Sequence, residues 1–188
     1  MTTSPGQPCV FFDRDGIVNR PPSAEQRYVT RAEDFHLLHG FTASLRLALA
    51  RGYRAVIVTN QSGITKGRMS HADLDRIHAK LRTELKAEGL DLHDILVCDS
   101  SDDQHPNRKP NPGLLLEAAR KHHLDLGRSW MVGDQEKDVT AGRRAGVART
   151  VKVKPAGTPT QADYQVDDMP ALARLLEQHL PPLGTAKL

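Results

Sequence analysis

The chain has 188 residues, of which 38% are hydrophobic and 26% charged, so it can bury a core and lacks the composition of a disordered protein. This length suits one domain, and we expect a single domain over residues 1–188 with its core at about 8–180. The 26 lysines and arginines barely exceed the 23 aspartates and glutamates, and only 4% of residues are aromatic. With no basic run or stacking surface, nucleic acid is excluded as the expected partner.

The two cysteines, Cys9 and Cys98, are too few for a disulfide framework and form no C-x-x-C zinc pattern. The first residues lack the charged and apolar segments of a secretory signal. No stretch reaches the roughly 18 consecutive apolar residues that a membrane helix needs. We therefore expect a soluble protein in a reducing cytoplasm, without a membrane partner.

Short apolar runs alternate along the chain with segments of helical spacing. In chain order they predict a strand at 9–12, a helix at 41–51, a strand at 55–58, a helix at 70–88, a strand at 94–98, a helix from Asn111 as N-cap to about 121, a strand at 129–132, a helix at 136–145, a strand at 148–153, an edge strand at 165–166 and a helix at 171–180. The tail from residue 181 has little to bury, and we expect it to be disordered.

This alternation predicts an α/β fold, a Rossmann-like three-layer αβα sandwich with a central parallel sheet, because right-handed crossovers place helices on both faces. In such sheets the ligand binds at the carboxyl ends of the strands. Polar residues follow three of the predicted strands at that edge, namely Asp13 with Asp15, Thr59 with Asn60, and Gly133 with Asp134.

Three of the four polar clusters also have an ordinary explanation. The pair at 13 and 15 suits a solvated turn, the basic pair at 108–109 suits a solvated surface, and Asp138 suits the positive end of a helix. The loop at 59–63, by contrast, offers a hydroxyl, amides and backbone N–H groups of the kind that bind phosphate. The ordered occurrence of all four clusters favours one shared anion site.

Taken together, these clusters resemble the four motifs of the haloacid dehalogenase-like superfamily of aspartate-nucleophile phosphatases. The matching segments are D-R-D-G-I-V-N at 13–19, T-N-Q-S-G at 59–63, R-K-P at 108–110, and V-G-D at 132–134 followed by Asp138. With Tyr28-Val29 and R-K-P-N-P-G included, the sequence is most similar to the branch of bisphosphate-heptose phosphatases and histidinol-phosphatases.

The resemblance implies an Mg²⁺-dependent phosphomonoesterase that acts on a small phosphate ester through an aspartyl-phosphate intermediate. It makes Asp13 the nucleophile, and it makes Asp15 the acid that protonates the leaving oxygen and the base that activates water. It places Mg²⁺ on the carboxylate of Asp13, the backbone carbonyl of Asp15 and Asp134.

The other motif residues are implied to bind phosphate or to support the site. Lys109 supplies a fixed positive charge, Arg108 clamps another substrate oxygen, and Asp138 orients Lys109 or a water on the metal. The implied phosphate-binding residues are Asn19, Thr59, Asn60, Gln61, Ser62, Arg108 and Lys109.

Two features depart from the branch. Its members often carry Lys after the Gly-Asp of the last motif, whereas this chain has Gln135 and so one cation fewer near the substrate. They also commonly carry a zinc loop of three Cys and one His, of which this chain retains Cys98 and His105. Two ligands do not close a structural zinc site, so we expect a shortened loop without zinc.

The intervals between the motifs leave no room for a separate cap domain, so we expect a capless, open site. We then expect two loops to determine which substrate binds. One follows Asn19 and includes Arg20, Arg27 and Tyr28, and the other is the loop at 100–107. Arg20 and Arg27 either attract a second anionic group of the substrate or are solvated surface charges.

The implied favourite substrate is D-glycero-D-manno-heptose 1,7-bisphosphate, and histidinol phosphate is the alternative; no residue separates them. A non-catalytic phosphate-binding module is a different possibility, against which Asp13, Asp15, Lys109 and Asp134 argue, because all are intact. A phosphomutase would need a cap to shield its intermediate from water. The branch and the absence of an apolar surface stripe favour a monomer.

Overall fold

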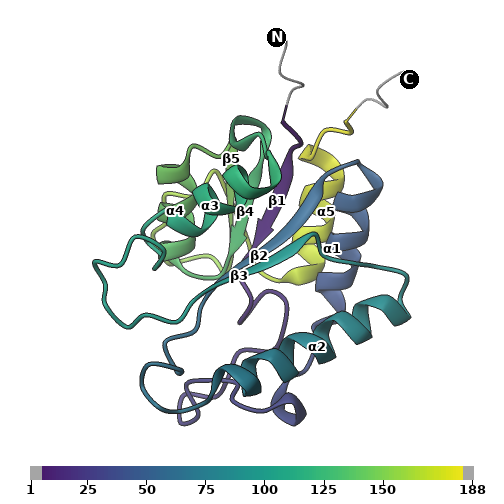
Figure 1. The fold of residues 1–188 in the computed structure, drawn as a ribbon. Coiled ribbons are helices and arrows are strands. Elements are labelled where there is room, and N and C mark those ends of the chain that lie inside the picture. The colour runs from purple at the N-terminus through teal and green to yellow at the C-terminus, as the bar shows by residue number, and fades with distance from the viewer. Residues whose placement is uncertain (1–5, 184–188) are drawn as a thin grey trace.

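A computed structural model describes residues 6–183, in which a six-stranded parallel sheet lies between helices (Figure 1). The strands are β1 (Cys9–Phe12), β2 (Arg54–Asn60), β3 (Asp94–Cys98), β4 (Trp130–Gly133), β5 (Arg149–Val153) and β6 (Tyr164–Val166). The α-helices are α1 (His39–Ala50), α2 (His71–Ala87), α3 (Gly113–His122), α4 (Glu136–Ala145) and α5 (Met169–His179), with short 3-10 helices η1 (Ala32–Asp34) and η2 (Leu126–Arg128). The predicted α/β class, with its order of elements, is confirmed.

The strands pair in the order β3-β2-β1-β4-β5-β6, and every pair is parallel. At the centre, Phe12 of β1 lies opposite Ile57 of β2 and Val132 of β4. The chain winds in one direction from β1 to β3 and in the other from β4 to β6. Such a reversal leaves a crevice at the carboxyl ends of the central strands, and Asp13 follows β1 directly into it.

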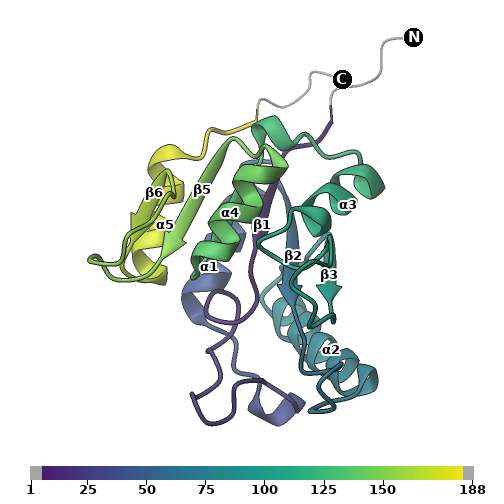
Figure 2. The ribbon, with the colours of Figure 1, turned by 90° about the vertical axis from the view of Figure 1, so that its left-hand side faces the viewer.

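Alternate residues of β1 face two separate cores. Val10 and Phe12 belong to the apolar cluster that includes buried residues of α1, α2 and α5, whereas Cys9 and Phe11 belong to the cluster with α3 and α4. Figures 1 and 2 show α3 and α4 on one side of the sheet and α1 and α5 on the other. All four residues are fully buried, which explains why β1 is a continuous apolar run.

Two predicted details are wrong. Asn111 does not cap α3, because the N-cap position is Pro112. The side-chain amide of Asn111 donates instead to the carbonyls of Asp103 and His105 in the preceding loop. The predicted disorder of the tail fails for residues 181–183, because the Leu183 N–H donates to the Arg51 carbonyl and its side chain packs against the core. Residues 184–188 lie outside the described part of the chain.

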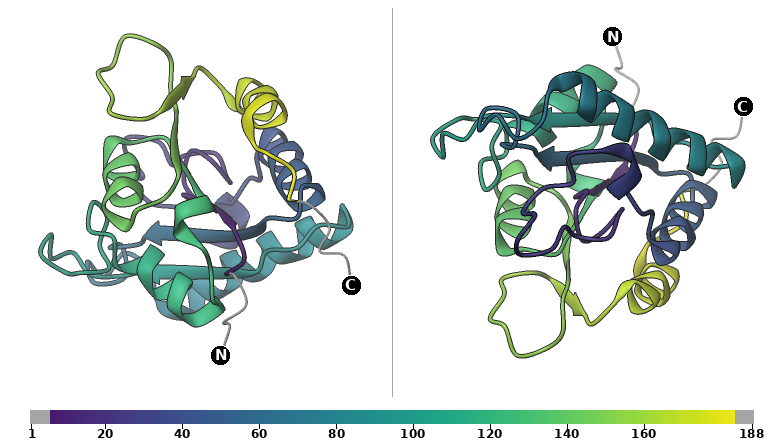
Figure 3. Two further views of the ribbon diagram at one scale, coloured as in Figure 1. Left: turned by 90° about the horizontal axis from the view of Figure 1, so that it is seen from above. Right: turned by 90° about the horizontal axis from the view of Figure 1, so that it is seen from below.

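The segment between β1 and α1, residues 13–38, crosses the carboxyl edge of the sheet and is best seen from below (Figure 3, right). The ammonium of Lys80 in α2 holds this segment in place by donating to the carbonyls of Ala32 and Phe35. Across residues 6–183, the intervals between the motifs hold this segment and core elements, with no separate cap domain. None of the helices in that range combines the length and apolar character needed to span a bilayer.

Candidate active site at the carboxyl edge of the sheet

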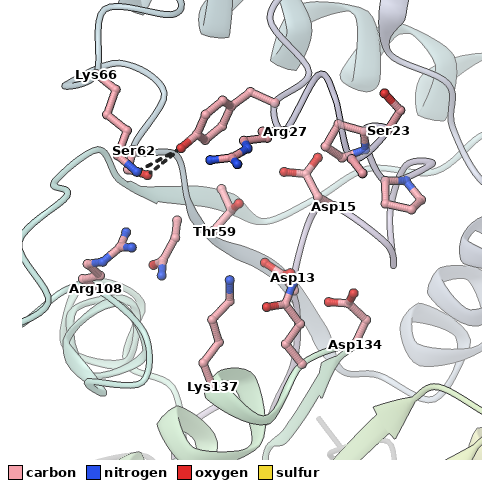
Figure 4. Close-up of a pocket in the computed structure, with 16 residues that line it drawn as sticks. Asp13, Asp15, Ser23, Arg27, Thr59, Ser62, Lys66, Arg108, Asp134 and Lys137 are labelled. Carbon is pink, nitrogen blue, oxygen red and sulfur yellow. Dashed lines mark hydrogen bonds between the residues drawn. The ribbon is translucent and has the colours of Figure 1, made fainter.

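A pocket of about 430 Å³ opens where β1, β2 and β4 end (Figure 4). Seven of the residues predicted from the motifs line it, namely Asp13, Asp15, Thr59, Asn60, Ser62, Arg108 and Asp134. Two further lysines that the sequence did not single out, Lys66 and Lys137, also line it. The motifs therefore meet in one place, although they are spread over most of the chain.

Two glycines leave room for the acidic side chains of the last motif. Gly16 has φ +92°, and a Cβ at this position would lie 2.9 Å from Cγ of Asp134. A Cβ on Gly133 would lie 2.3 Å from Cβ of Asp138, which is closer than any side chain tolerates. The glycines in these motifs thus serve the packing of acidic residues around the pocket.

Asp13 is held at the pocket floor by Lys109. The Lys109 ammonium lies 2.7 Å from Oδ1 of Asp13 and 2.7 Å from Oδ1 of Asp138. Burial and then the charge of Asp138 raise the pKa of Asp13, whereas Lys109 opposes the rise. Burial alone would lower the pKa of Lys109, but the two carboxylates raise it well above the usual range of a lysine. Lys109 is therefore a permanent cation in this site.

Asp138 is fully buried beside Lys109 and the start of α4. Oδ1 pairs with Lys109, and Oδ2 accepts a hydrogen bond of 3.1 Å from the backbone N–H of Gln135 at the start of α4. This geometry suits the predicted supporting role, in which Asp138 orients Lys109.

Three donors surround the carboxylate of Asp15. Nη2 of Arg14 lies 3.0 Å from Oδ1, the amide of Asn19 2.9 Å from Oδ1, and the amide of Gln61 3.0 Å from Oδ2. Burial alone would raise the pKa of Asp15, but Arg14, Asn19 and Gln61 outweigh it and lower the pKa. Sequence reasoning missed Arg14, because a charged residue between two aspartates gives no sign that it is fully buried.

Predicted phosphate-binding residues divide into pocket-lining and supporting positions. Asn19 and Gln61 are buried and direct their amides at Asp15, with Gln61 also donating to Oγ1 of Thr59. Asn60 lines the pocket, but its side chain clamps the backbone of Lys109, donating to the carbonyl at 2.9 Å and accepting from the N–H at 3.0 Å. Their predicted contacts with phosphate stay predictions.

The outer wall joins the segment after β1 to the loop after β2. The Tyr28 hydroxyl lies 3.4 Å from Oγ of Ser62, and the Lys66 ammonium donates to that hydroxyl at 3.2 Å (Figure 4). Arg27, with φ +58°, lines the pocket, whereas Arg20 lines a neighbouring hollow outside it. Arg27 is thus the better placed of the two predicted specificity arginines.

Arg108 enters the pocket from the loop that precedes α3. Its Nε donates to Oδ1 of Asp103 at 2.8 Å, and its Nη1 donates to the carbonyl of Ser100 at 3.0 Å. In the same loop, Sγ of Cys98 lies 3.7 Å from Nδ1 of His105. The absence of zinc from this loop stays a prediction.

The acidic residues of the pocket fit a divalent cation. Ligand atoms of Asp13, Asp134 and Asp138 lie within 4.8 Å of one another. Oδ1 of Asp134 is buried and has no hydrogen-bond partner within the described chain. Burial, followed by the charge of Asp138, raises the pKa of Asp134 to about 6. A buried carboxylate oxygen without a donor is the kind of ligand that Mg²⁺ takes, and Asp138 is already occupied by Lys109.

Residues 106–172 match the family model for HAD-hydrolase-like proteins. The chain is 32% identical over 179 residues to a D-glycero-alpha-D-manno-heptose-1,7-bisphosphate 7-phosphatase of Photorhabdus laumondii, covering 89% of this chain and 95% of the relative. It is 36% identical over 154 residues to a D-glycero-beta-D-manno-heptose-1,7-bisphosphate 7-phosphatase of Helicobacter pylori, covering 80% and 87%.

Among solved structures, the fold is similar to the D,D-heptose 1,7-bisphosphate phosphatase of B. bronchiseptica in complex with magnesium and phosphate. The TM-score is 0.80 at 30% identity, and the match covers 92% of this chain and 99% of the other. Sequence, fold and the arrangement of the motifs agree, so the chain belongs to the haloacid dehalogenase-like phosphatases, and within them to the family of these heptose-1,7-bisphosphate 7-phosphatases.

Proposed function

We propose that this protein is an Mg²⁺-dependent phosphomonoesterase that removes one phosphate from D-glycero-D-manno-heptose 1,7-bisphosphate. The observation that carries the proposal is the buried Asp13, held by Lys109 beside Asp134 at the floor of a pocket lined by cations. The relatives that match most of the chain are named for this substrate. The pocket supports it, because Arg27, Lys66, Arg108 and Lys137 suit a sugar with two anionic groups.

In the first step, the carboxylate of Asp13 attacks phosphorus, and the bond from phosphorus to the sugar oxygen breaks. Lys109 donates to Oδ1 of Asp13 and so fixes the orientation of the attacking carboxylate. The leaving oxygen takes a proton from Asp15, which has to bind that proton before this step because its neighbours favour the carboxylate form. Thr59 lines the pocket beside Asp13 and donates to a phosphoryl oxygen.

In the second step, Asp15 takes a proton from a water molecule, which attacks the aspartyl-phosphate and releases inorganic phosphate with Asp13 restored. Arg14, Asn19 and Gln61 favour the carboxylate form of Asp15, which is the form that accepts this proton. The same residue therefore serves as acid and then as base.

Asp13, Asp134 and the backbone carbonyl of Asp15 would hold Mg²⁺, and Asp138 would act through Lys109. When bound, Mg²⁺ neutralises the repulsion between the dianionic phosphate and the carboxylate of Asp13. The buried and unpartnered Oδ1 of Asp134 supports this assignment.

A comparison of kcat/KM by released phosphate tests the substrate. We expect the highest value for one anomer of heptose 1,7-bisphosphate, with the phosphate at carbon 7 removed, and the relatives' names leave both anomers open. A preference for histidinol phosphate would replace the sugar substrate. Failure to release phosphate from any ester, with Mg²⁺ present, would leave only a phosphate-binding module.

We further propose that the chain is a single domain and a monomer of the reducing cytoplasm. Among residues 6–183, Leu116 is the one large hydrophobic side chain that is widely exposed, at 46%. Both cysteines are free and buried. Light scattering coupled to size exclusion should give the mass of one chain, and a dimer mass would contradict the proposal.

A further inference from the structure

The ammonium of Lys109 is surrounded by three protein oxygens. A lysine offers three N–H donors, and Lys109 places its ammonium 2.7 Å from Asp13, 2.7 Å from Asp138 and 2.8 Å from the Val58 carbonyl. Its side chain is fully buried, and it does not line the pocket. The cations that the pocket wall presents to a phosphate are therefore other residues.

Lys137 is the pocket cation that remains available. It projects from the first turn of α4 into the pocket, on the same side as Asp13 and Asp134 (Figure 4). Within residues 6–183 its ammonium makes no ion pair and no hydrogen bond, and its charge opposes the raised pKa of Asp134. Its side chain is half-buried, so α4 limits the directions it can take.

The other pocket cations are engaged or lie at the rim. Arg108 donates to Asp103 and to the Ser100 carbonyl, and Lys66 donates to the Tyr28 hydroxyl. Arg27 is exposed on the segment that crosses the sheet edge. Arg108, Lys66 and Arg27 come from other segments, whereas Lys137 lies near Asp134 at the end of β4.

We propose that Lys137 binds the transferred phosphoryl group directly, donating to an oxygen of that group while Lys109 holds Asp13 in place. Gln135, which begins α4, is neutral, so Lys137 is the residue of this turn that brings a positive charge to the phosphate. The proposal rests on the proposed phosphatase function and adds a residue to it. Lys137 then stabilises both the bound ester and the charge that spreads over the phosphoryl oxygens during transfer.

The experiment compares Lys137→Met and Lys137→Arg with Lys86→Met, a matched change at an exposed lysine that does not line the pocket. Affinity for inorganic phosphate is measured by calorimetry with Mg²⁺ present, and kcat/KM is measured with p-nitrophenyl phosphate, which has one phosphate and no sugar. Circular dichroism and thermal melting check that each variant is folded.

We expect Lys137→Met to weaken phosphate binding roughly tenfold and to lower kcat/KM roughly 10- to 100-fold, as the loss of a charge-assisted hydrogen bond implies. Lys137→Arg should recover most of both, and Lys86→Met should match the wild type. Unchanged phosphate affinity and unchanged turnover of p-nitrophenyl phosphate in Lys137→Met would overturn the proposal. This holds even if turnover of the heptose bisphosphate falls, because Lys137 would then bind the second phosphate of that substrate. If the wild type binds phosphate but hydrolyses no ester, the proposed function is wrong. The role of Lys137 in phosphate binding can then still be tested by calorimetry.

Discussion

The ammonium of Lys109 lies 2.7 Å from Oδ1 of Asp13, and the two side chains are buried together at the floor of the pocket. The pair joins the end of β1 to the loop before α3, two segments far apart in the sequence. Because Asp138 shares the same ammonium, one cation holds two carboxylates that would otherwise repel each other. We therefore expect the stability and the proposed activity of this protein to depend on the same contact.

Replacing Lys109 with Met should destabilise the fold by about 3–5 kcal/mol, because it leaves two buried carboxylates without their counter-charge. Urea unfolding at neutral pH measures this loss, and Lys86→Met provides the control for removing an exposed lysine. A variant as stable as the wild type would show that the buried pair contributes nothing to folding. Turnover should also be lost, since Asp13 is no longer held in place.

Replacing Asp13 with Asn should lower phosphatase kcat by at least about a thousandfold while leaving the fold intact, because an amide cannot form the acyl phosphate. The amide oxygen can still accept a hydrogen bond from Lys109, so thermal melting should stay close to that of the wild type. Asp75→Asn, at an exposed position on α2, is the matched control. Substantial turnover by Asp13→Asn would remove Asp13 from the role of nucleophile.

Removal of divalent metal with EDTA should stop turnover, and added Mg²⁺ should restore it. Titration of the wild type with Mg²⁺ should also raise its melting temperature, because a ligand that binds only the folded state stabilises it. Asp134→Asn should lose most of this shift, since it removes the buried oxygen that has no other partner within residues 6–183. An equal Mg²⁺-induced shift in the variant would place the metal elsewhere.

Metal analysis of the purified protein should find no tightly bound zinc. Cys98 and His105 lie together, but a closed structural zinc site takes four ligands. Cys98→Ser should therefore keep the melting temperature within a few degrees of the wild type, even after treatment with a zinc chelator. One zinc per chain, lost in this variant, would be the contrary result.

The contribution of His78 to stability should fall on the acid side of neutrality, whereas the raised pKa values of Asp13 and Asp134 act in the opposite direction. Burial, and then the charge of Arg14, lowers the pKa of His78 from its usual 6.5 to about 4. Between these values the unfolded chain binds a proton at His78 that the folded chain does not, so this contribution to stability is fully present above pH 6.5 and is lost as the pH falls to about 4. The full effect is roughly 3 kcal/mol.

The variant His78→Leu tests this pH dependence. Nε2 of His78 is buried without a hydrogen-bond partner among the described residues, so an apolar side chain should be tolerated at neutral pH. In urea unfolding between pH 7 and pH 4, the stability of His78→Leu relative to the wild type should rise as the pH falls. His71→Leu, at an exposed histidine, should keep the wild-type slope, and an unchanged slope in His78→Leu would refute the assignment.

Much of the fold could be predicted, because each strand is a short apolar run and each helix repeats apolar residues at three and four positions. Details that depend on competing local contacts could not be. Asparagine is a common N-cap residue, but the side-chain amide of Asn111 donates to carbonyls of the loop before α3 instead. Thr59 and Asn60 were expected in a turn, yet they extend β2 because Val97 and Cys98 of β3 lie beside them.

By itself, the sequence determined the order of the elements, the four motifs and the edge of the sheet where they gather, since these depend on periodicity and on residues next to each strand. Only the tertiary structure decided what each polar side chain contacts. It turned Asn19 and Gln61 toward Asp15, buried Arg14 against the same carboxylate, and directed the Lys109 ammonium to Asp13 and the Val58 carbonyl. Such contacts join segments from different strands, and their geometry depends on how the sheet and helices pack, which no local pattern in the sequence records.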